Sequence, residues 1–184
     1  MSCVAGRAVA KKGYDTLLSA LSAIPPDINW RFVHVSGGPL TSALKKQARS
    51  LGLEQRIDWL GAQEQSVVID TLKDGQIFVL ACRIGDDGDR DGLPNVLMEA
   101  QSQHLPCIST VISAIPEFIV SGTTGILVAP DDPQSLAQAM IELIASPARC
   151  RWEKWSSRKC LFIIYAKIYA SRRGDLPRGE AICR

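Results

Sequence analysis

The sequence lacks the hallmarks of a membrane protein, a secreted disulfide-rich protein and a zinc protein. It has no N-terminal signal peptide, and no apolar stretch approaches the roughly 20 residues that a membrane-spanning helix needs. Its six cysteines form no Cys-x-x-Cys pair and no zinc-binding spacing. We therefore expect a reducing, cytoplasmic location. Cys3 and Cys107 lie in apolar runs and are expected to be small buried residues.

The sequence does contain enough apolar material for one domain, and its charge is unevenly distributed. Of its 184 residues, 46% are hydrophobic and 22% are charged, which is a globular composition. The first 148 residues carry 11 Lys and Arg against 16 Asp and Glu, whereas the last 36 carry 10 against 3. We therefore expect an acidic domain over residues 1–148 and a basic tail over residues 149–184.

Short apolar runs typical of strands alternate with segments of helical period. Strands are expected at residues 2–4, 31–35, 57–60, 77–80, 106–109 and 126–128. The helical segments lie between and after them, centred on residues 17–24, 40–51, 67–72, 91–103 and 136–144. This order predicts an α/β fold with a parallel sheet covered by helices on both faces. Ligands of such sheets bind beyond the carboxyl ends of the strands, where Arg7, Gly37 and the 81–92 loop would converge.

The run from Asp91 to Ala100 is the most informative motif. Gly92 permits a tight turn, and Pro94 suits the first position of a helix, which needs no amide hydrogen. Free amides at a helix start, with the positive end of the helix dipole, bind phosphate groups. The expected donors are the N–H groups of Leu93, Asn95, Val96 and Leu97. Glu99 would lie farther along, within reach of a ribose, and Asp91 at the mouth, which indicates a nucleotide-sugar site.

Other interpretations of this run are an ordinary capped helix and two acidic sites. Asp87, Asp89 and Asp91 match the first half of an EF-hand loop, but its twelfth position holds Met98 in place of the required Glu. No metal is therefore expected. A hydrolase would use Asp91 and Glu99 as a carboxylate pair, which requires side chains roughly 5–10 Å apart across a sugar bond.

Six motifs occur together along roughly residues 2–146. They are Gly6-Arg7 followed by Lys11-Lys12-Gly13, Gly37-Gly38-Pro39-Leu40, Phe78-Val79-Leu80, Asp91–Ala100, Ser113–Glu117 and Gly122–Val128. In this order and spacing they resemble the C-terminal, donor-binding half of a retaining family-four (group 1) glycosyltransferase of the GT-B fold. The resemblance implies a Rossmann-like parallel sheet with helices on both faces.

The resemblance implies that a sugar passes from a UDP- or GDP-sugar to a hydroxyl acceptor with retention, in polysaccharide or glycolipid biosynthesis. Arg7 and Lys12 would contact the diphosphate, which leaves no need for a metal or another cofactor. Asp91, where the family most often has Glu, would contact the transferred sugar as the catalytic acid. The implied donor-binding residues are Gly6, Arg7, Lys12, Gly37, Gly38, Gly92, Leu93, Asn95, Val96, Leu97 and Glu99. The two histidines are expected outside this set, with His34 in the core and His104 as a solvated helix cap.

In such enzymes the acceptor domain normally precedes the donor-binding half, and Met1 falls inside the first expected strand. We therefore expect the chain alone to bind a nucleotide sugar without transferring it. The acceptor, a sugar or a lipid, would bind through the missing N-terminal domain. The alternative function is a non-catalytic nucleotide-sugar-binding module or an inactive fragment, and no nucleic-acid partner is expected.

Residues 149–184 depart from the family pattern. Trp152, Trp155 and three of the six cysteines appear there without a sustained helical period. The favoured interpretation is a frame-shifted or otherwise non-native terminus. The alternative is a basic, aromatic segment around residues 161–165 that contacts the inner face of a membrane.

Overall fold

Helices and strands alternate along the described part of the chain. The computed structural model describes residues 6–145. Its elements, in chain order, are η1 (Ala10–Lys12), α1 (Tyr14–Ser22), β1 (Phe32–Val35), α2 (Thr41–Ser50), η2 (Glu54–Arg56), β2 (Ile57–Gly61), α3 (Gln65–Asp74), β3 (Phe78–Leu80), α4 (Asn95–Ser102), β4 (Cys107–Thr110), α5 (Ile115–Phe118), β5 (Gly125–Val128) and α6 (Pro133–Ala145). The five strands match five of the six that the sequence predicts. The one expected at residues 2–4 lies outside the described residues.

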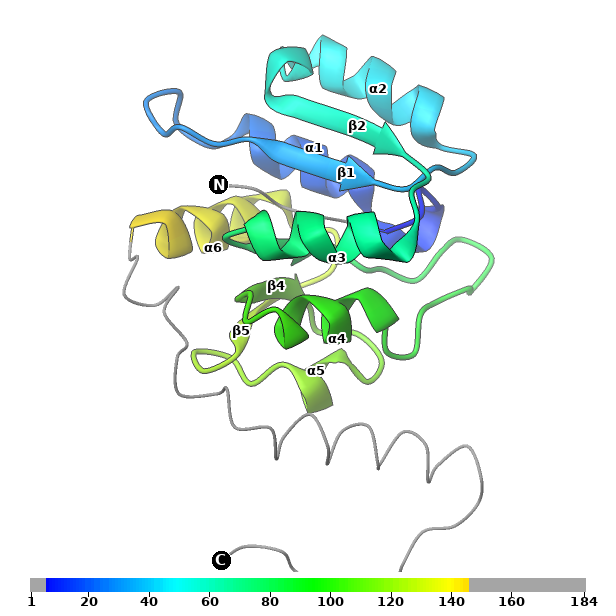
Figure 1. Cartoon of the computed structure of the whole chain (residues 1–184), viewed down its shortest axis with the longest axis vertical. Coiled ribbons are helices and arrows are strands. Elements are labelled where there is room, and N and C mark those ends of the chain that lie inside the picture. The colour runs from blue at the N-terminus through cyan, green and yellow to red at the C-terminus, as the bar shows by residue number, and fades with distance from the viewer. Residues whose placement is uncertain (1–5, 146–184) are drawn as a thin grey trace, which may run out of the picture. The chain divides into compact units, whose positions relative to one another are not determined.

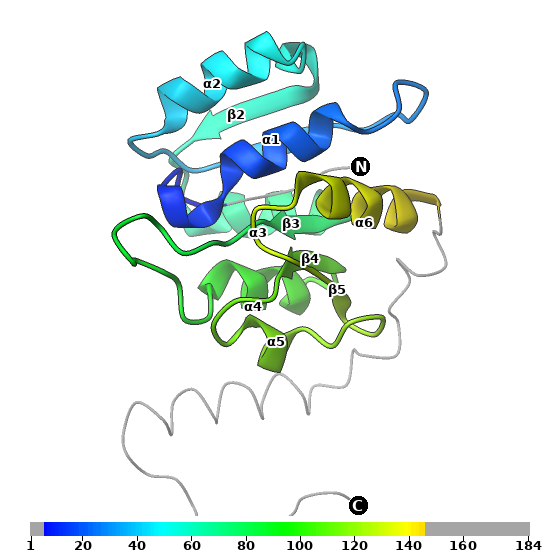
Figure 2. The same cartoon turned by 180° about the vertical axis from the view of Figure 1, so that it is seen from behind.

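The strands form two parallel sheets. β1 pairs with β2 (Figure 1), and β4 lies between β3 and β5 in the second sheet (Figure 2). In that sheet Cys107 pairs with both Phe78 and Gly125. Gly125 has no room for a side chain, because a Cβ there would lie 2.0 Å from the carbonyl oxygen of Cys107. The predicted parallel pairing is therefore confirmed.

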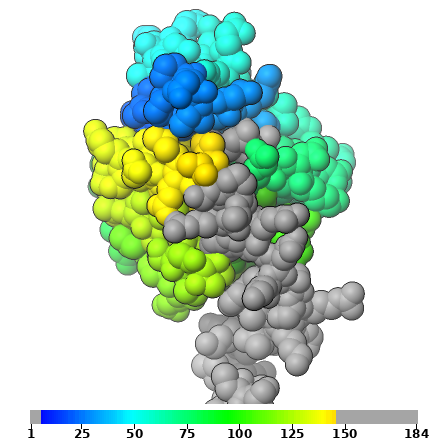
Figure 3. All heavy atoms as spheres, turned by 90° about the vertical axis from the view of Figure 1, so that its left-hand side faces the viewer, coloured from blue at the N-terminus to red at the C-terminus, as the bar shows by residue number. Residues whose placement is uncertain are grey.

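Helices cover both faces of the second sheet. α3 and α4 lie on one side, and α1 and α6 lie on the other (Figures 1 and 2). α4 packs against β3 and β4, whereas α6 packs against β4, β5 and α1. Figure 3 shows the yellow surface of α6 directly beneath the blue segment that joins α1 to β1. The α/β architecture expected from the sequence is therefore confirmed.

The second sheet forms the centre of the hydrophobic core. Every residue of β3 and β4 is buried, as expected for parallel strands covered on both faces. The polar residues of β4 are satisfied there. The hydroxyl groups of Ser109 and Thr110 donate to the carbonyl oxygens of Leu80 and Cys82 at 2.7 and 2.5 Å. Cys107 is a buried free cysteine, which confirms its predicted place, and burial raises the pKa of its thiol.

α4 begins later than the sequence pattern predicts. Its first helical residue is Asn95, and Pro94 is the N-cap, with φ −64° and ψ 124°. Placing Pro94 at the first helical position was therefore wrong. A proline fixes φ but leaves ψ free, and here ψ takes the extended value of a capping residue.

α2 and α4 end in the same backbone motif. Gly52 follows α2 with φ +71°, and His104 follows α4 with φ +63°. In each case the next residue closes the helix by donating its N–H to a carbonyl five positions earlier. These bonds join Leu53 to Ala48 at 2.9 Å and Leu105 to Ala100 at 3.1 Å. The predicted stop at Gly52 and the predicted exposed cap at His104 are both confirmed.

Three short elements were not predicted from the sequence: the 3-10 turns η1 and η2 and the four-residue helix α5. No helix within residues 6–145 has both the length and the apolar character needed to span a membrane. The prediction of a non-native or membrane-bound tail concerns residues 149–184, which lie outside the described part of the chain.

Candidate functional site

Residues 6–8, where the described part of the chain begins, lie against the Gly37–Gly38 turn. The N–H of Ala8 donates to the carbonyl of Gly37 at 3.1 Å, and the N–H of Leu40 donates to the carbonyl of Ala8 at 3.3 Å. A Cβ on Gly38 would lie 2.4 Å from the carbonyl oxygen of Ala8, whereas a Cβ on Gly37 would meet nothing within 4 Å. Close packing against Ala8 therefore requires a glycine at position 38 and not at position 37.

Gly13 fixes the position of the preceding lysines. It adopts φ +59°, in the left-handed region that favours glycine, and a Cβ there would lie 2.0 Å from the carbonyl oxygen of Ala81. The turn from η1 into α1 therefore lies directly on the chain that leaves β3. This contact brings Lys11 and Lys12 to the carboxyl end of that strand.

Two lysines and two aspartates form a cluster at this end of β3. The Lys12 Nζ lies 2.7 Å from the Asp91 Oδ2, and the Lys11 Nζ lies 3.0 Å from the Asp89 Oδ2 and 3.5 Å from the Asp91 Oδ1. The Lys12 and Asp91 side chains are only 11% and 17% exposed, so water screens their attraction weakly. The hydrogen bond to Asp89 raises the pKa of Lys11. The structure thus brings together two residues, Lys12 and Asp91, that the sequence placed in one site.

The first turn of α4 leaves three of the four expected amide donors open. Among the hydrogen bonds of residues 6–145, none uses the N–H of Leu93, Asn95 or Val96. The N–H of Leu97 donates to the carbonyl of Pro94 at 3.0 Å, so its assignment as a free donor was wrong. Pro94 is the N-cap, and its carbonyl therefore accepts the first bond of the helix.

Gly6 places the chain's opening beside α4. A Cβ on Gly6 would lie 3.9 Å from the Val96 Cγ1. The Gly6 carbonyl accepts hydrogen bonds from the Tyr14 hydroxyl and, at 3.1 Å, from the His34 Nε2. His34 is fully buried, as predicted, and burial lowers its pKa. No sequence pattern predicts its bond to Gly6, because that bond depends on how β1 packs against residues 6–8.

Glu99 and Arg7 have different surroundings. The Glu99 Oε1 accepts a hydrogen bond from the Gln65 Nε2 at 3.0 Å, so Glu99 contacts the first residue of α3. Arg7 is exposed and forms no ion pair with another described residue. Glu99 and Asp91 therefore have separate partners, which gives no support to a carboxylate pair acting on one bond.

A hollow of about 540 Å³ opens beside Asp91. Its lining comes from the loops that follow β3 and β4: Ile84, Arg90, Gly92, Ile112 and Ser113. The carbonyl of Gly92 accepts the N–H of Ala114 at 3.2 Å, which ties the two loops together. Gly92 therefore lines this hollow next to Asp91. The described residues contain no group of three or more His, Cys, Asp and Glu side chains that could hold a metal ion.

A family model described as glycosyl transferases group 1 matches residues 2–146 of the sequence. The chain therefore belongs to this family, and its parallel sheets with helices on both sides match the GT-B fold of its structural neighbours. The GDP-mannose-dependent monoacylated alpha-(1-6)-phosphatidylinositol monomannoside mannosyltransferase of Corynebacterium glutamicum is 33% identical over 147 residues, covering 78% of this chain and 37% of that protein.

Two solved structures share the fold. Anabaena HepE in complex with UDP matches with a TM-score of 0.74 at 19% identity, covering 94% of this chain and 49% of that one. The C-terminal domain of the group 1 protein LpcC from Francisella tularensis matches with a TM-score of 0.68 at 25% identity, covering 82% and 78%. The chain corresponds to the C-terminal domain of the family, and it spans only about a third of the length of the curated relatives it matches.

Proposed function

We propose that residues 6–145 bind the nucleoside diphosphate sugar donor of a retaining glycosyltransferase. One observation carries the proposal: Lys12 reaches Asp91 at the entry to α4, whose first amides are open, while Gly6 lies against Val96 of the same helix turn. A shielded cation next to open helix-end amides is suited to a diphosphate. HepE was solved with UDP, and the C. glutamicum relative is named for GDP-mannose, which supports a nucleotide ligand here.

In this proposal the chain stabilises the leaving diphosphate. As the bond between the sugar and the diphosphate breaks, negative charge grows on the phosphate oxygens. Lys12, Arg7 and the amides of Leu93, Asn95 and Val96 supply fixed positive charge and donors for it. A metal ion has no required part, because these groups neutralise the charge. The Lys12–Asp91 ion pair opens when the diphosphate takes over Lys12, which leaves Asp91 to contact the transferred sugar.

Glu99 and the glycine turns complete the proposed donor site. Glu99 accepts hydrogen bonds from the ribose hydroxyls, and Gln65 holds its carboxylate in place from α3. Gly37 lies on the open side of the turn, where nothing would meet its Cβ within 4 Å, so a nucleotide can approach its backbone. Gly38 supports that turn from behind, against Ala8.

The binding proposal is tested with the full 184-residue chain and with UDP, GDP and ADP and their sugars. A ligand present at a hundred times its dissociation constant should add about 2.7 kcal/mol of stability, measured as a shift in the melting temperature. Lys12→Met should abolish the shift. Lys73→Met is the matched control, because Lys73 also pairs with an aspartate, Asp70, at 2.8 Å but lies on the surface of α3. Equal shifts in the wild type and Lys12→Met would overturn the proposal.

Transfer is tested separately from binding. The curated relatives are about three times as long as the region they share with this chain, so we expect donor binding without turnover by the chain alone. The measurement is release of free nucleotide from the bound donor in the presence of sugar and lipid acceptors. Turnover that depends on Asp91 would show that the chain is a transferase by itself, whereas binding without any turnover also fits the non-catalytic module.

A further inference from the structure

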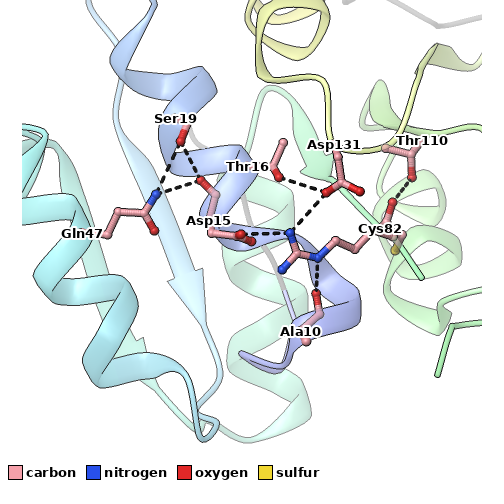
Figure 4. A network of polar contacts seen from close by, with 9 residues as sticks. Ala10, Asp15, Thr16, Ser19, Gln47, Cys82, Thr110 and Asp131 are labelled. Carbon is pink, nitrogen blue, oxygen red and sulfur yellow. Dashed lines mark hydrogen bonds and ion pairs between the residues drawn. The ribbon is translucent and has the colours of Figure 1, made fainter. Parts of the chain in front are cut away.

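The Arg83 side chain makes three polar contacts close to the proposed site. It lies just after β3, with its side chain 24% exposed. Its Nη1 lies 2.9 Å from the Asp15 Oδ2 and 3.2 Å from the Asp131 Oδ1. Its Nε donates to the carbonyl of Ala10 at 3.1 Å, and its backbone N–H donates to the carbonyl of Lys11 at 3.0 Å. Figure 4 shows Ala10, Asp15 and Asp131 gathered around this guanidinium group.

These contacts join three segments that are distant in the sequence. Asp15 lies in the first turn of α1, and Asp131 lies in the loop between β5 and α6. One further contact holds the Asp131 carboxylate, and another holds the backbone of Asp15. The hydroxyl of Thr16 donates to the Asp131 Oδ1 at 3.4 Å, and the Gln47 amide donates to the carbonyl of Asp15 at 3.0 Å (Figure 4). Arg83 therefore links η1, α1 and the β5–α6 loop to the end of β3.

Two of the bonds from Arg83 end on the backbone immediately before Lys12. They hold η1 from the side of β3, while Gly13 holds its other end against Ala81. The position of the Lys12 ammonium at the entry to α4 therefore depends on the Arg83 guanidinium and on the backbone hydrogen bond from residue 83 to Lys11. We propose that Arg83 is a positioning residue: it fixes the η1 turn so that Lys12 meets the second phosphate of the donor. This inference rests on the donor-binding role proposed for Lys12.

An arginine suits this position better than other cations. Its planar fork can donate from Nε to the Ala10 carbonyl and from Nη1 to two carboxylates at once, whereas a lysine offers a single point charge. Removal of the guanidinium would leave Asp15, Asp131 and the Ala10 carbonyl without this partner in a partly shielded place. The turn would then lose its fixed position even though the backbone bond from residue 83 to Lys11 remains possible.

The test compares nucleoside diphosphates with monophosphates, because the proposal concerns the second phosphate alone. Dissociation constants of UDP and UMP, and of GDP and GMP, are measured by calorimetry for the full chain and its Arg83→Gln variant. We expect the variant to weaken diphosphate binding roughly tenfold, as for a displaced charge-assisted contact, and to leave monophosphate binding within about twofold. The diphosphate affinity of Arg83→Lys should lie between those of the wild type and Arg83→Gln. Equal weakening of both ligands would indicate a merely structural role and would overturn the proposal.

Arg49→Gln is the matched control, because Arg49 also donates to a carboxylate, that of Glu54, at 3.0 Å but lies on the surface of α2. It should leave both constants unchanged. Asp131→Asn removes one carboxylate partner without touching Arg83, and should lower the preference for the diphosphate in the same direction as Arg83→Gln. This second variant covers the case in which Arg83→Gln fails to fold.

The variant pair Arg83→Gln and Lys12→Met separates this inference from the donor-binding proposal. If Arg83 acts through Lys12, then Arg83→Gln should have no further effect on diphosphate binding in the Lys12→Met background. If Lys12→Met alone leaves the diphosphate preference unchanged, the donor-binding proposal fails. If Lys12→Met abolishes that preference and the effects of the two variants add in full, only the role of Arg83 fails.

Discussion

The two sheets differ in burial and in what they bring to the proposed site. β3 and β4 are buried throughout, whereas β2 is partly open and its Leu60 is 42% exposed. The half of the chain that holds β1 and β2 brings Gly6, Lys12 and the glycine turn. The half that holds β3, β4 and β5 brings Asp91 and the entry to α4. The half with the buried sheet thus supplies Asp91, and the half with the more open sheet supplies Lys12, which pairs with it.

Truncation of one side chain in each sheet should show the largest contrast. Phe78→Ala in β3 removes a fully buried ring and should lower the free energy of unfolding by about 3–5 kcal/mol. Leu60→Ala in β2 should cost less than about 1 kcal/mol, because much of that side chain already faces water. Urea unfolding followed by circular dichroism measures both. Similar costs would show that the two sheets contribute equally to the core.

The two adjacent glycines on the more open side provide the next contrast. Gly38→Ala places a Cβ 2.4 Å from the carbonyl oxygen of Ala8 and should cost about 1–3 kcal/mol, because backbone must move. Gly37→Ala meets no atom within 4 Å and should stay within about 0.5 kcal/mol of the wild type. Melting curves of the two variants test this difference. A destabilised Gly37→Ala would indicate a tighter turn than the structure has.

The ion pair that joins the two halves should be stronger than one within a half. Lys12–Asp91 is shielded, whereas the Arg49 and Glu54 side chains are 71% and 58% exposed. Double-mutant cycles with Lys12→Met and Asp91→Asn should give a coupling of about 1–3 kcal/mol. Those with Arg49→Gln and Glu54→Gln should give less than about 1 kcal/mol. Raising the salt concentration should weaken only the second coupling appreciably.

The smallest effects are expected at the helix ends, where each half uses a different residue for the same turn. His104→Gly should stabilise the protein by about 0.5–1 kcal/mol, because glycine adopts the left-handed conformation without a steric penalty. Gly52→Ala should cost a similar amount, about 1 kcal/mol, since a Cβ there has room but the backbone angle is unfavourable. Thermal unfolding shows whether each variant is more or less stable than the wild type. A change in the same direction for both would mean that side-chain contacts, and not backbone angles, determine the stability effect at these positions.

The sequence predicted β3 well because this strand, covered on both faces, appears as a continuous apolar run. Prediction was poorest for short elements. α5 has only four residues, too few to show a helical period, and η1 depends on the left-handed Gly13 that follows it. The start of α4 was placed too early because Pro94 is compatible with both a cap and a first helical position.

For the site, the family resemblance placed Lys12 and Asp91 at one donor molecule, and the structure brings their charged groups within 2.7 Å of each other. Topology alone predicted a convergence of Arg7, Gly37 and the 81–92 loop, since the carboxyl ends of parallel strands share one edge. Contacts between side chains and distant backbone were not predictable. Arg83 shows this clearly, because its bonds to Ala10 and Lys11 depend on how η1 lies over β3. The one available signal was a charged residue directly after a fully apolar strand. The bonds of Tyr14 and His34 to Gly6 had no comparable signal.

The carbonyl of Gly6 makes the protein sensitive to mild acid. The Nε2–H of the neutral His34 ring donates to that oxygen. A second proton, on Nδ1, would have no hydrogen-bond acceptor among the described residues. Burial holds the pKa of His34 below its ordinary value of about 6.5, so the unfolded chain takes up this proton first. The contribution of His34 to stability should therefore be constant above neutrality and decline as the pH falls from about 6.5.

The sequence has only two histidines, so the decline in stability below neutrality can be assigned by replacing each in turn. His34→Gln should flatten the decline in urea midpoints between pH 7 and pH 5, whereas His104→Gln should leave it in place. A decline that survives His34→Gln would have to come from carboxyl groups, whose ordinary pKa values near 4 place their effect at lower pH. If His34 is responsible, a shift from pH 7 to pH 5 should weaken the packing of the segment that contains Gly6. The affinity for a phosphate ligand should then fall at a higher pH than the one at which the whole domain unfolds.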